Sequence, residues 1–242
     1  MIGVAAIVFH SGVASAQDAV WSAYFGVDNV RPARALQNCN LPMNETFDGI
    51  PVVFSSEIDQ TTLSASDFSI ELKDGTIVTP VCATLGPSDE ENEDRTVLLA
   101  GQFGDTRGVR PVRVTIVGSL LDESGRELKG RSTAVTGFGA GPSVMLAEQI
   151  NSAELEVAIS RSTMGPKCPA RTTVQAVRLI WNGGVTRDGT RELNDSDRQQ
   201  YVLRLKDLDG TVRNVTPFAM GDLDDGITCK TCVSISRARL WM

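Results

Sequence analysis

Five cysteines are the side chains of this sequence that point most directly to chemistry: Cys39, Cys82, Cys168, Cys229 and Cys232. Cys39 and Cys82 bracket a predicted β-hairpin, so we expect them to form a disulfide inside one structural unit. We expect Cys168 to pair with Cys229 or Cys232 and take Cys232 as the partner, which leaves one thiol free. Cys229 and Cys232 also have the spacing of a redox or zinc pair. A single such pair is weak evidence, and we prefer structural pairing.

Carboxylates form two candidate calcium sites. Asp222, Asp224, Asp225 and Gly226 have the spacing and the glycine of a calcium loop, although no bidentate acid follows them. The stretch from Asp89 to Asp94 carries five acidic side chains in a predicted loop, for which a solvated hairpin loop is the preferred interpretation. Calcium at Asp222, Asp224 and Asp225 is therefore the one possible cofactor.

Other classes of chemistry are disfavoured by composition. The net charge of −7 argues against a nucleic-acid binder, which needs a basic face. The single histidine, His10, lies in a predicted leader, which argues against histidine-based catalysis and metal binding. The glycines from Gly137 to Gly141 lack the lysine of a phosphate-binding loop, and no pair of acids stands in a catalytic motif. We therefore predict no enzymatic activity.

The first residues have the pattern of a secretory signal peptide. The apolar run Ile2–Phe9 is followed by Ala14-Ser15-Ala16, so we expect cleavage before Gln17 and a leader of residues 1–16. A buried N-terminal strand is the alternative. No later apolar run has the roughly 20 residues of a membrane-spanning helix, so none is predicted after cleavage. Export to an oxidising compartment favours disulfides.

The elements that position these residues are repeated along the chain. The segment from Leu63 to Pro80 returns from Leu193 to Pro217, including an Asp-Gly turn and a Thr-Pro pair. Phe54 and Trp181 stand at equivalent places, 15 and 13 residues after Cys39 and Cys168. We infer a tandem duplication, with Trp181 in a core-facing position.

Periodicity within each repeat is that of β-strands. Apolar residues alternate with polar ones over Phe68–Leu72 and Tyr201–Leu205, and each run leads into a hairpin turn at Gly75 or Gly210. Further strands are expected at 95–100, 112–117 and 127–129, the last after a turn at 122–125. Residues 143–150 fit either a short helix or a strand.

Two motifs in the first repeat resemble the bacterial Ig-like domains of surface-layer and cell-envelope proteins. The first runs from Val52 to Phe68, with Ser55, Ile58-Asp59 and Ser66-Asp67-Phe68 at its key positions. The second is the turn Asp122-Glu-Ser-Gly125 followed by Leu128. The resemblance covers about residues 50–130 and implies an Ig-like β-sandwich while saying almost nothing about function.

The sequence therefore predicts an all-β protein of two tandem Ig-like, Greek-key units, residues 28–140 and 141–242. We expect the second unit to be incomplete, because it has only 25 residues after Pro217 whereas the first unit continues for about 50 residues past Pro80, and because residues 227–242 turn basic after an acidic stretch. The predicted function is an exported structural or interaction module of the cell envelope or extracellular space, with an unidentified envelope protein or polysaccharide as partner. The alternative is a calcium-dependent binding module.

Overall fold

The computed structural model describes residues 6–8, 19–30, 39–42, 44–86, 94–150, 173–185, 193–206, 210–222 and 230–236. In these residues the regular structure is β-strand with short 3-10 helices and no α-helix, which confirms the all-β prediction. The chain separates into two compact units. Unit one comprises Ala14–Met145 with Asn182–Gly184, and unit two comprises Met1–Val13, Leu146–Trp181 and Val185–Met242.

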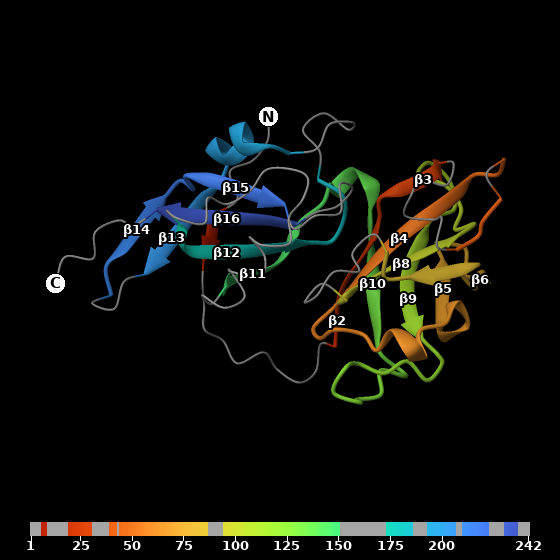
Figure 1. The fold of residues 1–242 in the computed structure, drawn as a ribbon. Helices are drawn as coiled ribbons and strands as arrows, with labels where there is room; N and C mark the ends of the chain where they lie inside the picture. Colours follow the sequence, from red (N-terminus) through yellow and green to blue (C-terminus); the bar gives the residue numbers. More distant parts are fainter. Residues whose placement is uncertain are drawn as a thin grey trace. The chain divides into compact units, whose positions relative to one another are not determined.

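Unit one is a nine-stranded sheet, coloured red-orange to green in Figure 1. Its strands are β2 (Val20–Phe25), β3 (Val27–Val30), β4 (Phe47–Phe54), β5 (Phe68–Leu72), β6 (Ile77–Val78), β7 (Cys82–Thr84), β8 (Thr96–Gly101), β9 (Pro111–Ile116) and β10 (Ser132–Gly137). They pair in the order β6-β5-β9-β10-β2-β4-β8-β7, and β3 adds to β4.

The sheet of unit one is curled. Its two end strands, β6 and β7, are separated in sequence only by residues 79–81. Four steps of 3.8 Å span at most about 15 Å, so the two ends of the strand order must lie close together. Strand β10 joins the two halves, because Ser132–Ala134 pair antiparallel with β9 while Val135–Gly137 pair parallel with β2.

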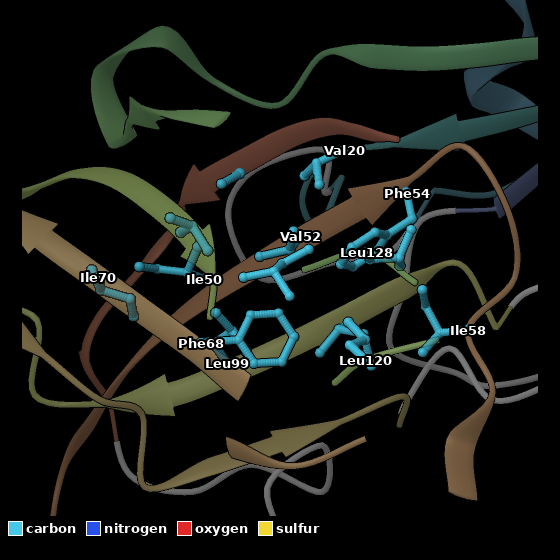
Figure 2. Close-up of a cluster of buried hydrophobic side chains, with 14 of the residues drawn as sticks. Val20, Ile50, Val52, Phe54, Ile58, Phe68, Ile70, Leu99, Leu120 and Leu128 are labelled. Carbon is cyan, nitrogen blue, oxygen red and sulfur yellow. The ribbon is translucent and has the colours of Figure 1, made fainter. Parts of the chain in front are cut away.

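The core of unit one fills the space enclosed by this curl. Figure 2 shows its side chains gathered between the strands, among them Phe54, Phe68 and Leu99, all at most 1% exposed. Alternation along β5 explains its contribution, since Phe68, Ile70 and Leu72 are buried while the residues between them are partly exposed. Removal of this apolar surface from water is the main force that stabilises the unit.

Unit two contains two smaller sheets. Its strands are β1 (Ala6–Val8), β11 (Val144–Ile150), β12 (Thr173–Trp181), β13 (Val202–Lys206), β14 (Val212–Val215), β15 (Ala219–Asp222) and β16 (Lys230–Ser236). One sheet has the order β11-β12-β16-β15 and the other the order β1-β13-β14. Of residues 143–150, all but Ser143 form a strand, which decides between the two alternatives left by the sequence. Arg178 on β12, only 7% exposed, donates to Glu148 on β11 at 2.7 Å.

The sequence repeat appears in the local structure of both units. A capped 3-10 turn precedes each inner strand, with Ser64 and Asp67 forming a capping box before β5 and Asn194 and Asp197 forming one before β13. Hairpins follow both strands. Their turn glycines, Gly75 and Gly210, have φ values of 87° and 88°, a conformation that favours glycine.

Several elements differ from the sequence-based expectations. Strand β2 lies before the boundary predicted at residue 28, and β10 forms at Ser132–Gly137, where no strand was predicted. The strand expected at 127–129 is wrong, because Glu127 makes only an isolated bridge to Leu121. Residues 230–236, in the segment of altered composition, form β16 between β12 and β15.

Part of the predicted leader also lies in a sheet. Ala6–Val8 form β1, which pairs parallel with β13 in the full chain. The alternative that we named is a buried N-terminal strand, of which the structure shows the strand pairing. Cleavage before Gln17 stays a prediction.

Candidate functional site

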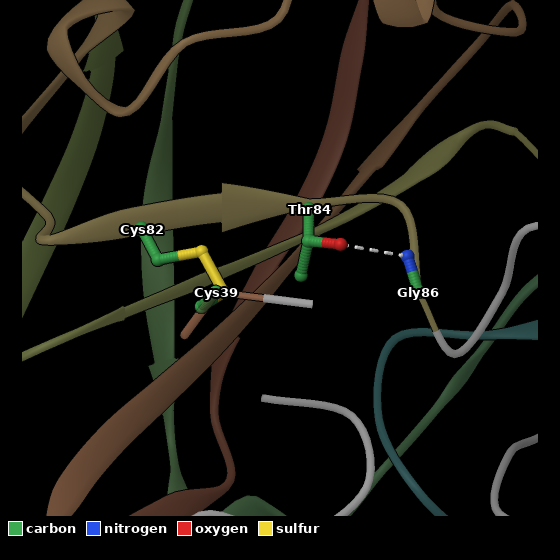
Figure 3. The surroundings of a disulfide bond; sticks show 4 residues. All are labelled: Cys39, Cys82, Thr84 and Gly86. Carbon is green, nitrogen blue, oxygen red and sulfur yellow. Dashed lines mark hydrogen bonds between the residues drawn. A yellow bond between two sulfur atoms is a disulfide. The ribbon is translucent and has the colours of Figure 1, made fainter. Parts of the chain in front are cut away.

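The disulfide predicted between Cys39 and Cys82 is present (Figure 3). The two Cα atoms lie 5.8 Å apart and the bridge closes 43 residues of sequence separation. Cys82 begins β7, an end strand of the sheet, and pairs in register with Ala100 of β8. Two residues after Cys82, the hydroxyl oxygen of Thr84 accepts from the Gly86 amide at 3.1 Å, which shapes the exit from β7. The bridge therefore fastens the segment before β4 to the sheet edge.

Next to the disulfide, the first residues of β4 bring an aspartate into the interior. Phe47 is 4% exposed and packs with Ala100, while the side chain of Asp48 is completely buried. One carboxylate oxygen of Asp48 accepts from the Asn29 amide at 2.9 Å, and the other accepts from the Phe103 amide at 2.6 Å. Asp48 thereby ties β3 and the loop after β8 to β4.

Two further carboxylates lie near Asp48. Asp28 accepts from the amide of Thr106 at 2.9 Å and from its hydroxyl at 2.8 Å. Asp105 accepts from the amides of Arg107 and Gly108. Each carboxylate of this group, which we call the Asp48 cluster (Asp28, Asp48 and Asp105), is thus bound to backbone amides of loop residues.

The Asp48 cluster perturbs two pKa values in opposite directions. Burial raises the pKa of Asp48, the amides of Asn29 and Phe103 counteract this in part, and the charges of Asp28 and Asp105 add to the increase. For Asp28, the hydrogen bond from the Thr106 amide is the main reason that its pKa is lowered. A buried acid with a raised pKa is a feature of catalytic sites, but here both oxygens already accept from the backbone.

A second buried carboxylate organises the turn that the sequence had singled out. Asp122, 1% exposed, accepts from the amide and hydroxyl of Ser124 and from the amide of Arg126. Its other oxygen forms an ion pair with the Arg126 guanidinium at 2.9 Å. Burial opposes ionisation of Asp122, but these hydrogen bonds and the charge of Arg126 outweigh it and lower its pKa. Gly125 completes the turn with a φ of 80°.

The two motifs that carry the family resemblance contact each other at this turn. Ile58 bridges Asp122, and the Asp59 amide donates to the Leu121 carbonyl at 3.1 Å. The Arg126 guanidinium reaches Ser56 at 3.1 Å. Thr62 accepts from the Leu121 amide at 3.1 Å. The motif residues therefore hold the loop after β4 to the turn after β9, which is a structural role.

An ion pair flanks this contact. Arg95, whose side chain is 13% exposed, lies 3.5 Å from Glu57, and its Nε atom is buried without a hydrogen-bond partner among the described residues. Glu57 also accepts through its carbonyl from the Glu123 amide at 2.9 Å. The pair joins the residue that precedes β8 to the same loop.

Sites predicted in unit two fall largely outside the described residues. Asp222 is the last residue of β15, where it pairs in register with Thr231, whereas Asp224 and Asp225 are not among the described residues. Cys232 lies in β16, opposite Arg178 of β12, and Cys168 and Cys229 are outside the described ranges. The acidic stretch is described only at Asp94. Calcium binding and the second disulfide stay predictions.

Trp181 differs from its counterpart in the first repeat. Phe54 is fully buried, but Trp181 is only partly buried and contacts Tyr201 edge to face, with ring centroids 6.5 Å apart. Its indole nitrogen is buried and has no hydrogen-bond partner among the described residues. The prediction of a core-facing position for Trp181 is therefore confirmed only in part.

No motif in the sequence indicates the Asp48 cluster. Asp48 is a single acid in the run Phe47-Asp48-Gly49-Ile50, and its partners Asn29 and Phe103 are 19 and 55 residues away. The local sequence offers one hint, the pair Asp28-Asn29, because these residue types favour turns. Asn29 has a positive φ of 53°.

Over the described ranges, no group of three or more metal-ligating side chains has an arrangement that could hold a metal ion. In the same ranges no helix is both long and apolar enough to span a membrane. The sequence matches no protein-family description, no curated protein and no solved structure.

Proposed function

We propose that this chain is an exported, non-enzymatic structural or interaction module of the cell envelope or extracellular space, built from two tandem Ig-like units. The observation that carries this proposal is the Cys39–Cys82 disulfide, because disulfides form and persist mainly in oxidising compartments. The apolar run Ile2–Phe9 with its Ala14-Ser15-Ala16 cleavage pattern supports the same compartment.

Strand order supports an Ig-like fold for unit one. Ig domains pair strands A, B, E and D in one sheet and G, F and C in the other. In unit one, β2-β4-β8-β7 correspond to the first set and β10-β9-β5 to the second, with β6 as a further strand beside C. The contact between Ile58 and Asp122 joins the two motifs that resemble bacterial Ig-like domains.

Unit two supports the tandem arrangement through the same strand order. The sequence β11-β12-β16-β15 is equivalent to β2-β4-β8-β7, and the hairpin β13-β14 is equivalent to β5-β6. A buried Thr-Pro proline precedes the next strand in both units, Pro80 before β7 and Pro217 before β15. Counterparts of β9 and β10 are not found among the described residues of unit two.

The buried carboxylates of unit one support a non-enzymatic role. Asp48 accepts from backbone amides of β3 and of the loop after β8, and Asp122 accepts from amides of its own turn, so both carboxylates stabilise the fold. A general acid or base needs at least one oxygen facing substrate. Structural use of both groups therefore favours a module whose function lies in its surfaces.

Export is tested by expressing the full chain in a bacterial host and fractionating the cells. We expect the exported protein to begin at Gln17 and to carry the Cys39–Cys82 bridge in non-reducing peptide maps. The matched control is Ile7→Arg, which places a charge in the apolar run and should leave the chain in the cytoplasm with both thiols reactive. A wild-type chain that keeps Met1 and stays in the cytoplasm with both thiols free contradicts the proposal.

The calcium-dependent alternative, through Asp222, Asp224 and Asp225, has its own test. A ligand that binds only the native state raises the melting temperature. We expect no shift at millimolar calcium if the leading proposal is right, and a shift that Asp224→Asn abolishes if the alternative is right.

A further inference from the structure

The strand that pairs with one edge of β13 in unit two differs from the strand at the equivalent edge in unit one. In unit one, β5 lies between β6 and β9. In unit two, its counterpart β13 lies between β14 and β1. Because the repeat aligns Phe68–Leu72 with Tyr201–Leu205, the short strand β1 occupies the place that β9 has in unit one. We call the side of β13 facing away from β14 the β13 edge.

The β13 edge is covered less completely than the same edge of β5. Strand β9 pairs antiparallel with the whole of β5, from Phe68 opposite Ile116 to Leu72 opposite Pro111. Strand β1 pairs parallel and contributes only three register pairs, Ala6 to Val8 opposite Val202 to Arg204. Parallel pairing of so short a strand is weak.

The strand that covers the β13 edge is also the segment that we expect to be removed. Residues 6–8 lie inside the predicted leader of residues 1–16, so this inference rests on the export in our proposed function. After cleavage before Gln17, the backbone groups of β13 that pair with β1 lose their partners. No other strand in the described part of the chain pairs with this side of β13, and an uncovered strand edge is a template for another strand.

We propose that the β13 edge is a strand-acceptor site of the mature protein, which binds an extended segment of another protein chain by β-augmentation. Residues 6–8 cover the site until the leader is removed. Main-chain hydrogen bonds hold the added strand, and alternate side chains give specificity. One face of the added strand is apolar, because Leu203 at the centre of β13 is fully buried and the corresponding face of β9 presents the buried Val114 and Ile116.

Charge on the other face identifies the partner more closely. In unit one, Glu71 on β5 lies opposite Arg113 on β9, and the two side chains are 3.5 Å apart. The repeat places Arg204 at the position of Glu71, so the sign is reversed on β13. Arg204 is exposed, and the next outward-facing residue, Lys206, is exposed and basic as well. The partner strand therefore alternates apolar residues with at least one acidic residue opposite Arg204.

The test uses mature protein that begins at Gln17, confirmed by N-terminal sequencing, and two peptides. The first peptide is residues 109–117 with Arg113→Glu, which supplies the apolar face of β9 and an acid. The second is the unchanged 109–117 peptide, which differs only in that charge. Amide hydrogen exchange is followed in β13 and in β5. Strand β5 is the internal control, because β9 already covers it.

We expect the acidic peptide to slow exchange of the Val202–Lys206 amides at least about tenfold and to leave β5 unchanged. It should bind roughly two- to fivefold more tightly than the unchanged peptide, the usual size of an exposed cross-strand charge effect. Arg204→Glu should reverse this preference, which a merely hydrophobic contact would not do. A version of the peptide with alternate N-methylated amides should give no protection.

Three outcomes overturn the proposal: no protection of β13, equal protection by the N-methylated peptide, or β13 amides already protected in a dimer of the mature chain, which makes a second copy the occupant. Failure of export is a separate result. If the chain keeps Met1, the same peptides are applied to the full chain carrying Ile7→Pro, which prevents β1 from pairing. Binding there supports the acceptor site although the proposed export has failed, and absence of binding refutes it.

Discussion

Buried aspartates lie near both ends of β4, and the charged groups around them have opposite signs. Asp48, at the start of the strand, has only backbone amides as partners, and Asp28 and Asp105 lie near it. Asp122, beside the loop that follows the strand, accepts from amides too but also pairs with Arg126. At Asp48 the two amide donors do not offset burial and the neighbouring like charges, whereas at Asp122 the Ser124 hydroxyl, two amides and the charge of Arg126 together outweigh burial.

The two aspartates therefore affect stability in opposite pH ranges. The folded pKa of Asp122 lies below its ordinary value of 3.8, so its contribution is complete above pH 3.8 and is lost as the pH falls through the folded pKa. The folded pKa of Asp48 lies above 3.8, so its contribution is complete below pH 3.8 and is lost as the pH rises through the folded pKa.

The largest effect is expected at the Asp48 end of β4, from the disulfide. Replacing Cys39 and Cys82 together by serine removes a crosslink that spans 43 residues. Chain-entropy arguments for a loop of this size give a loss of about 4 kcal/mol in the free energy of unfolding. Amide exchange of β4 in increasing urea reports unit one by itself. The wild-type protein with its disulfide reduced is the control and should lose the same amount, and a loss below about 1 kcal/mol in both would contradict the prediction.

The second-largest loss of stability is expected from a substitution at the other end of β4. Asp122→Ala leaves the Ser124 and Arg126 amides without their acceptor and the Arg126 guanidinium without its partner, so we expect a loss of about 3 kcal/mol. Asp74→Ala is the matched control, because Asp74 also accepts from a turn amide but is exposed. Asp74→Ala should have a much smaller effect. Equal losses in the two variants would show that burial of Asp122 is unimportant.

A smaller loss of stability is expected when the charge of Asp48 is removed and the shape of its side chain is kept. Asp48→Asn keeps one oxygen to accept from Asn29 or Phe103 and removes a buried charge beside Asp28 and Asp105. We expect a loss of less than about 1 kcal/mol at pH 7, because the usual net value of the lost hydrogen bond is partly offset by removal of an unfavourable buried charge. Asp122→Asn, which removes the ion pair with Arg126, should cost more. The reverse order, measured by the same exchange experiment, would refute the electrostatic contrast.

The features that could be predicted from the sequence are those with a local sequence signal. The β5–β6 hairpin was readable because alternation over Phe68–Leu72 and the Asp-Gly turn are local. The Asp122–Gly125 turn was readable for the same reason, and the Cys39–Cys82 pair because both cysteines bracket that hairpin. The hairpin and the turn depend on residues adjacent in sequence, and the disulfide, although it spans 43 residues, could be predicted because its cysteines flank that hairpin.

Features set by distant contacts were not readable. Strand β10 has the sequence Ser-Thr-Ala-Val-Thr-Gly, which carries little apolar alternation, and its strand conformation comes from pairing with β9 and β2. Asp48 acquires its role from Asn29 and Phe103, which only the folded sheet brings to it. The closing position beside β13 likewise depends on β1, which lies near the other end of the sequence.

The smallest effect is a change of one pKa inside the Asp48 cluster. Carbon-13 NMR of the carboxyl groups should show Asp48 titrating above 3.8 and Asp28 and Asp122 below it. Asp28→Asn removes a nearby like charge and should lower the pKa of Asp48, which nevertheless stays above 3.8 because burial is the larger cause.

Asp105→Asn provides an independent variant for this measurement, since the Asp28→Asn substitution also weakens the contact with Thr106 and so disturbs the loop. Both variants should shift the pKa of Asp48 in the same direction, while Asp122, next to Arg126 at the other end of β4, keeps its pKa and serves as the control. If the pKa of Asp48 rises or stays constant in both variants, the neighbouring charges do not act on it. Burial alone would then distinguish the two ends of the strand.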